Sequence, residues 1–152
     1  MGWGAGGTCN MSNMCPQSAY PLTSDTTASS GSCEVTCEVV PESACSGYVD
    51  VTSGSVSALT AAVYQQPVSI FIQANQKAIK QYGSGVFTGL CGQRLDHGVL
   101  VVGYGTDADS GLDYWNIKNS WGSAWGEEGY IRIEKSDADR CGVLDAPSYP
   151  TL

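Results

Sequence analysis

The sequence is poor in several kinds of residue, and each shortage excludes a class of protein. No run of apolar residues approaches the roughly 20 that a membrane-spanning helix needs, so we expect no membrane span. Lysine and arginine number only 7 against 15 aspartate and glutamate residues, a formal net charge of −8. Because nucleic-acid-binding proteins present clustered basic side chains, we expect no nucleic-acid partner. There is no internal repeat and no heptad pattern, which excludes a solenoid and a coiled coil.

Glycine and cysteine are plentiful instead. The 152 residues include 19 glycines but only 2 phenylalanines, which predicts a turn-rich fold large enough for one domain with its own core. Seven cysteines are more than a reducing cytosol usually tolerates, and Asn10 begins a glycosylation sequon. Both features indicate the secretory pathway, a lysosome or vacuole, or the extracellular space. The first residues lack a signal-peptide pattern, so we expect a removed signal or a piece of a longer product.

Two regions of the chain differ in composition. Residues 1–54 are rich in Gly, Ser, Thr, Cys and Pro, which predicts an irregular, Cys-rich segment pinned by disulfides. Residues 55–152 carry the regular patterns, and we expect the two regions to form one structural domain overall. A helix is predicted over 55–65, where apolar residues recur at helical spacing and a serine can cap the start, and Pro67 ends it.

After the helix, apolar and alternating runs separated by turns predict strands at 68–73, 98–105, 113–121 and 129–135. In the third run, Trp115 and Ile117 alternate with polar neighbours, so one set faces the core. Short connections between the later strands favour an antiparallel sheet or a small barrel and leave no room for crossover helices. The predicted class is therefore α+β.

His97, the only histidine, begins the apolar run 98–105. It is either a packed structural residue or half of a catalytic pair. A general base needs one ring nitrogen facing a nucleophile and the other held by an acceptor. Asn119, expected on the adjacent strand, offers a neutral acceptor, and the indole of Trp121 or Trp125 could keep water from that contact.

Several motifs together carry a family resemblance. LDHGVLVVGYG (95–105), YWNIKNSWGSAWGEEGYIRI (114–133) and RCGVLDAPSYP (140–150) resemble the C-terminal, histidine-bearing half of the papain-like cysteine peptidases, the cathepsin L and plant papain group. QPVSIFIQANQKAIKQYGSGVFTGLCG (66–92) matches the segment before the histidine, and SAYP (18–21) a mid-domain turn. The motifs occur in the family's order, and the resemblance implies the right-hand subdomain of that fold.

The resemblance also implies roles for single residues. His97 matches the catalytic histidine, Asn119 the residue that orients it, and Trp121 the indole that shields their contact. Trp125 matches a second aromatic residue on the leaving-group side of the cleft. Cys91 and Cys141 match a disulfide that ties the loop before the histidine to the C-terminal segment; these are the last two of the seven cysteines.

Three further residues fall where the family lines its main specificity pocket: Phe71, Leu95 and Ala146. The implied substrate is a peptide or protein with a bulky hydrophobic residue two positions before the cleaved bond. Phe71 is larger than the small residue often found at its position, so we expect a shallower pocket.

The nucleophile is where the sequence departs from the family. A Cys-Gly-Ser-Cys-Trp type segment and the oxyanion glutamine before it are both missing. The family places its histidine roughly 130–150 residues after the cysteine, which is more chain than precedes His97. Cys9 in GGTCN lacks the following tryptophan and any helical pattern before Pro16, so we interpret it as a disulfide cysteine.

The other cysteines allow a zinc site or disulfides. Paired CxxC elements are absent, so we expect disulfides, no metal and no cofactor. The resemblance places Cys33 where the family bridges to its other half, which makes it the candidate for an interchain disulfide. The pairing among Cys9, Cys15, Cys37 and Cys45 stays open.

Three hypotheses follow. The chain is the histidine and asparagine half of a cysteine endopeptidase, inactive alone and completed by a cysteine-bearing light chain or a larger assembly. Alternatively it is an inactive, peptidase-derived structural or binding subunit, although such a role would not require His97, Asn119 and Trp121 together. The third hypothesis is a small zinc-binding or redox protein. An isolated half would also expose an apolar patch near His97 and Trp125, which favours a partner.

Overall fold

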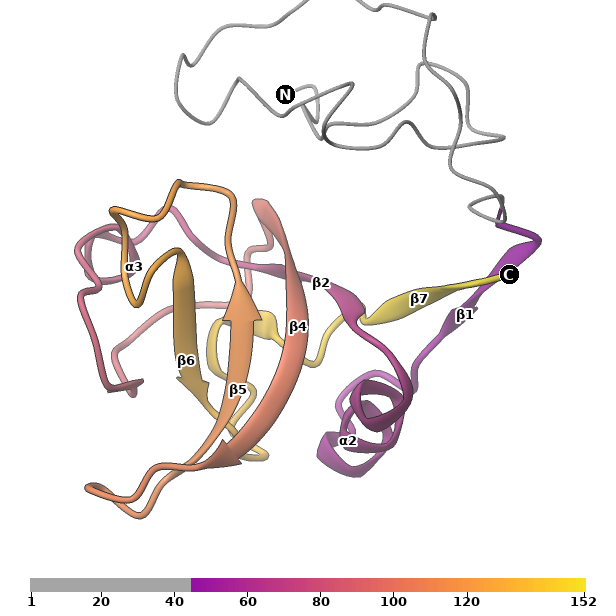
Figure 1. Ribbon diagram of the computed structural model, residues 1–152, viewed down its shortest axis with the longest axis horizontal. Coiled ribbons are helices and arrows are strands. Elements are labelled where there is room, and N and C mark those ends of the chain that lie inside the picture. Colours follow the sequence, from indigo (N-terminus) through magenta and orange to yellow (C-terminus); the bar gives the residue numbers. More distant parts are fainter. Residues whose placement is uncertain (1–44) are drawn as a thin grey trace, which may run out of the picture. The chain divides into compact units, whose positions relative to one another are not determined.

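A computed structural model of the chain describes residues 45–152 (Figure 1). Within it, Val49–Tyr149 form one compact unit. The predicted irregular segment falls largely outside the described residues, and the boundary expected at 54/55 stays a prediction. The sequon at Asn10 and four of the cysteines also lie outside them, namely Cys9, Cys15, Cys33 and Cys37.

Helix α2 spans Val56–Gln65, as the sequence predicts. The hydroxyl of Ser55 caps it by accepting a hydrogen bond from the backbone N–H of Ala58 at 3.1 Å. The buried residues recur at positions 59, 62 and 63 and form one face of the helix. The chain leaves the helix in an extended conformation at Gln66, directly before Pro67.

Seven strands form one sheet in the order β1-β7-β2-β4-β5-β6-β3. Four of them confirm the predicted strands within a residue or two at most ends: β2 (Val68–Ile72), β4 (His97–Thr106), β5 (Asp113–Lys118) and β6 (Tyr130–Glu134). The other elements are β1 (Gly47–Asp50), β3 (Val86–Phe87), β7 (Ser148–Thr151), helix α3 (Lys77–Lys80) and a 3₁₀ turn (Arg140–Gly142). The α+β class is confirmed.

Of the two predicted alternatives, an antiparallel sheet or a small barrel, the described residues form an open sheet with β1 and β3 as its edges. The sheet differs from the prediction in that it is not wholly antiparallel, because β3 runs parallel to β6. The predicted strand over 113–121 ends earlier, at Lys118, because Asn119 donates its backbone N–H to Gly129 at 2.9 Å and the chain turns there.

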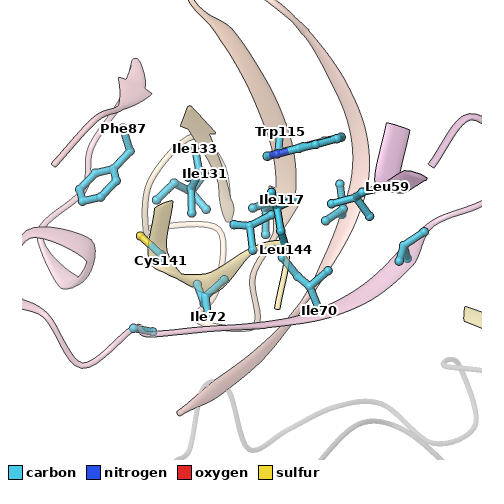
Figure 2. Close-up of a cluster of buried hydrophobic side chains, with 14 of the residues drawn as sticks. Leu59, Ile70, Ile72, Phe87, Trp115, Ile117, Ile131, Ile133, Cys141 and Leu144 are labelled. Carbon is cyan, nitrogen blue, oxygen red and sulfur yellow. The ribbon is translucent and has the colours of Figure 1, made fainter. Parts of the chain in front are cut away.

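The core lies where the inward faces of β2, β5 and β6 meet α2 and the C-terminal turn (Figure 2). In β2 and β5 buried residues alternate with more exposed ones, so Trp115 and Ile117 are the inward set. The fully buried side chains include Leu59, Ile70, Ile72, Trp115, Ile117, Ile131, Ile133 and Leu144. This face fixes the register of β2 against β4, and that register places His97 opposite Ile72.

Candidate active site

His97 and Asn119 are brought together by the pairing of β4 with its two neighbours. His97 is the first residue of β4, and Asn119 directly follows β5. The Nε2 atom of His97 and the Oδ1 atom of Asn119 lie 2.8 Å apart. The backbone N–H of Ser120 donates to the same Oδ1 at 2.7 Å, so the oxygen of the Asn119 amide faces the ring. An amide oxygen only accepts, and Nε2 therefore carries the proton.

This arrangement determines what the other ring nitrogen can do. With the proton on Nε2, the neutral imidazole has its lone pair on Nδ1, which is then free to accept a proton. Asn119 is itself only 9% exposed, so its amide is held by the fold rather than by solvent. The pair thus has the chemistry of a general base with an orienting partner.

The residue before the histidine is fixed in the same way. Asp96 accepts the backbone N–H of Ala74 through Oδ1 at 2.7 Å and donates its own N–H to the carbonyl of Ile72 at 3.0 Å. These two bonds extend the β2–β4 contact one residue beyond His97. The backbone on this side of the imidazole is therefore anchored to β2.

Trp121 covers the imidazole of His97, and Trp125 packs against Trp121. The ring of Trp121 stacks on His97, with centroids 5.1 Å apart and planes at 29°. Trp125 contacts Trp121 edge to face at 5.0 Å and donates its indole N–H to the carbonyl of Lys80 at 3.2 Å. Both indoles are half-buried. The stack shields one face of the imidazole from water, which favours the hydrogen bond to Asn119.

The three residues predicted to line a pocket lie on separate segments. Phe71 on β2 pairs with Gly98, and its side chain is 41% exposed. Leu95 is half-buried; a side-chain carbon at Gly142 would approach it to 2.4 Å, so Gly142 leaves room for it. Ala146 is exposed. Their role as a specificity pocket stays a prediction.

A disulfide joins Cys91 to Cys141, the pair implied by the family resemblance. It ties the loop before β4 to the 3₁₀ turn. Gln73 strengthens this junction, because its backbone N–H donates to the carbonyl of Cys141 at 2.8 Å and its Oε1 accepts the N–H of Arg94 at 3.2 Å. Cys45 is an exposed free thiol, so the disulfide expected there is not formed within the part of the chain that the structure describes.

Two further findings concern metal binding and membrane spans. Within residues 45–152, no three His, Cys, Asp or Glu side chains gather in a way that could hold a metal ion. None of the helices in the same range is long and apolar enough to cross a membrane.

Sequence reasoning missed an ion-pair network beside the tryptophans. Arg132 on β6 binds Glu127 through two parallel hydrogen bonds, at 2.8 and 2.7 Å, and binds Asp107 through its third nitrogen. Hydrogen bonds from the hydroxyl and backbone N–H of Ser110, and then from Arg132, lower the pKa of Asp107 to about 2. The only available signal was a glutamate and an arginine flanking a Gly-containing turn in GEEGYIR.

Comparisons with known proteins found a matching family and similar proteins. The family model described as "Papain family cysteine protease" matches residues 7–151. Vignain from Ricinus communis is 47% identical over 123 residues, which cover 79% of this chain and 34% of that protein. Cysteine proteinase COT44 from Brassica napus is 50% identical over 107 residues, covering 68% and 32%.

Solved structures show the same fold. The bromelain protease from Ananas comosus, in complex with the E64 inhibitor, superimposes with a TM-score of 0.77 at 36% identity, covering 92% of this chain and 63% of that one. Digestive procathepsin L 3 of the Tenebrio molitor larval midgut gives a TM-score of 0.78 at 41% identity, covering 93% and 45%.

The fold and the histidine–asparagine pair define a papain-like α+β protein of the cysteine-peptidase class. The chain belongs to the papain family of cysteine proteases. It spans about a third of the length of the curated relatives described above.

Proposed function

We propose that this chain supplies the histidine and asparagine half of a cysteine endopeptidase site. The observation that supports this most strongly is the contact of 2.8 Å between His97 Nε2 and Asn119 Oδ1, since it leaves Nδ1 as a base. The thiol comes from a segment with the family's nucleophile motif, which the 152 residues do not contain. In this proposal the chain alone hydrolyses nothing, and a cysteine-bearing light chain or a larger assembly completes it.

The proposed reaction is acyl transfer to the thiol followed by hydrolysis. Nδ1 of His97 takes the thiol proton, and the thiolate attacks the peptide carbonyl to form a C–S bond. The imidazolium then gives that proton to the leaving amine as the C–N bond breaks. Water hydrolyses the thioester, with Nδ1 accepting its proton and returning it to the thiol. The sum is one peptide bond and one water giving an acid and an amine.

Asn119 and Trp121 act on His97 rather than on the substrate. The neutral amide keeps the ring in one tautomer and one orientation without adding charge, because its oxygen accepts from both His97 and Ser120. The Trp121 ring on the imidazole face limits competing water. Both contacts persist through the two proton transfers at Nδ1, so the ring need not reorient between steps.

The substrate we propose is a peptide or protein with a bulky hydrophobic residue two positions before the cleaved bond. Phe71, Leu95 and Ala146 would form the apolar wall that receives it, and the exposed Phe71 would make that pocket shallow. The Cys91–Cys141 disulfide supports an oxidising location, in the secretory pathway, a lysosome or vacuole, or outside the cell.

The alternative is an inactive subunit of peptidase descent with a structural or binding role. Such a subunit has no need of a base, so a substitution at His97 distinguishes the two. If the proposal is right, native material contains a chain with a Gly-Ser-Cys-Trp type peptide, detectable by mass spectrometry and labelled by a thiol-directed epoxide.

In such material His97→Ala abolishes hydrolysis and Asn119→Ala reduces it by about 10²-fold or more. The matched control is Gln76→Ala, a partly exposed polar residue outside the site, which leaves the rate unchanged. Full hydrolysis with His97→Ala, or active material in which the epoxide labels no associated chain, would refute the proposal in favour of another mechanism or of the binding role.

A further inference from the structure

Arg132 binds two carboxylates and lies against an aromatic ring. Its Nε and Nη2 atoms donate to the two oxygens of Glu127 at 2.8 and 2.7 Å, its Nη1 binds Asp107, and its guanidinium lies 5.2 Å from the ring centroid of Tyr114. Two parallel hydrogen bonds to one carboxylate fix direction as well as distance, which a lysine cannot do. These bonds also hold the pKa of Glu127 below its usual value.

The network continues from Arg132 to Tyr82. Glu127 Oε1 also accepts the backbone N–H of Gly85 at 2.9 Å. The hydroxyl of Tyr82 donates to the carbonyl of the same Gly85 at 2.6 Å and accepts the backbone N–H of Arg132 at 3.3 Å. Tyr82 is buried, and its hydroxyl end is therefore fixed by the same residues that hold the ion pair.

From Tyr82 a line of aromatic rings leads to the imidazole. Its ring centroid lies 5.7 Å from that of Trp125, which lies 5.0 Å from Trp121, which lies 5.1 Å from His97. Gly126, between Trp125 and Glu127, brings the backbone close to the Tyr82 ring. Its φ is +60°, and a side-chain carbon there would sit 2.5 Å from the carbonyl oxygen of Tyr130 and 3.0 Å from the Tyr82 ring. The backbone between Trp125 and Glu127 therefore packs directly on that ring.

We propose that Arg132 is a positioning residue for His97, acting through Glu127 and Tyr82 on the two tryptophans. Its importance for hydrolysis rests on the proposed function, whereas its effect on the His97 ring does not. Arg140 offers a matched comparison, because it pairs with Glu134 and is similarly exposed, at 27% against 23% for Arg132. No contact described for Arg140 leads to the tryptophans.

The test uses the single histidine of the full 152-residue chain as its own probe. The Cδ2–H resonance of His97 carries the ring-current shift of Trp121, so NMR reports whether the stack is kept. Arg132→Lys keeps the positive charge but loses the two parallel hydrogen bonds to Glu127. We expect the His97 resonance to move toward its position in Trp121→Leu, the variant that lacks the stacked ring. Arg140→Lys leaves the resonance unchanged, even where it lowers Tm as much.

An unmoved His97 resonance in Arg132→Lys, or an equal movement in Arg140→Lys, would overturn the proposal. If Arg132→Lys fails to fold, Tyr82→Phe removes only the hydroxyl. It should move the resonance in the same direction by a smaller amount, and a wild-type signal in it would also overturn the proposal. If the His97 resonance moves in Arg132→Lys but the completed wild-type protein hydrolyses no peptide, Arg132 positions His97 and the proposed peptidase function is wrong. If the completed protein hydrolyses peptides but the resonance does not move in Arg132→Lys, the peptidase function holds and the role proposed for Arg132 is wrong.

Discussion

The two ends of strand β4 lie in different surroundings. At its first residue, His97 is held by the buried Asn119, stacked by Trp121 and preceded by an anchored backbone. At its last residue, the exposed Thr106 donates to the exposed Asp113 at 2.6 Å and leads into a polar turn. One end of the strand therefore lies in the candidate site, and the other leads into a solvated loop. The difference is that a buried polar partner, Asn119, orients the side chain at the first end.

The buried Trp115 packs near the last residues of β4, and its loss should have the largest effect. It is fully buried in β5 and paired with Tyr104 in the β4–β5 register. Trp115→Ala should lower the free energy of unfolding by about 3–5 kcal/mol, because it removes apolar contact and leaves a cavity. Denaturant titration measures this, with the exposed Tyr64→Ala as control. A loss below about 1 kcal/mol would mean that the core is not organised around β5.

The disulfide should affect mainly the His97 end. Replacing Cys91 and Cys141 together by serine should cost about 2–4 kcal/mol, because the 50-residue loop between them is no longer closed in the unfolded chain. Thermal unfolding with and without a reductant measures this. The reductant should destabilise the wild type more than the double variant. If the reductant lowers the Tm of the wild type and of the double variant equally, the loss of stability comes from other cysteines.

The other end of β4 should show acid sensitivity. The pKa of Asp107 is about 2 in the folded chain, below its ordinary value of 3.8. Protonation therefore favours the unfolded state, and the stability that Asp107 contributes is complete above about pH 4 and lost as the pH falls toward 2. Asp107→Asn should flatten the dependence of Tm on pH in this range, while the exposed neighbour Asp109→Asn should not. Equal profiles for wild type and Asp107→Asn would contradict the assignment.

The smallest expected effect is at Lys135. Its Nζ lies 4.9 Å from the ring centroid of Tyr104 and 5.3 Å from that of Trp115, in a partly exposed position. Lys135→Met should cost about 0.5–1 kcal/mol and leave the His97 resonance unchanged. A shifted His97 resonance would show that the packing of Lys135 also reaches the imidazole, by a route separate from the one proposed for Arg132.

Much of the scaffold could be predicted because its cause is local. The helix over 56–65 follows from a capping serine and apolar spacing, and the inward set of β5 follows from alternation. The short elements β3 and α3 have too few residues to show a period. The parallel pairing of β3 with β6 and the open sheet depend on contacts between distant segments, which no local pattern encodes.

In the candidate site, too, some contacts could be predicted from the sequence and others could not. The contact of His97 with Asn119 was expected from their places on neighbouring strands and from the family resemblance, and the two atoms do lie at hydrogen-bond distance. The network of Arg132 was missed, because its partners come from separate turns that meet only in the folded chain. The roles of Phe71, Leu95 and Ala146 need a bound substrate to be tested.

The protonation of the two His97 ring nitrogens tests the proposed base most directly. In the full chain, at a pH where the imidazole is neutral, ¹⁵N NMR distinguishes a protonated from an unprotonated ring nitrogen. We predict the proton on Nε2 and a free lone pair on Nδ1, with the shift of the Nε2 signal caused by its hydrogen bond lost in Asn119→Ala. A proton on Nδ1, or the same spectrum in Asn119→Ala as in the wild type, would contradict the claim that this pair forms the base of a cysteine-peptidase site.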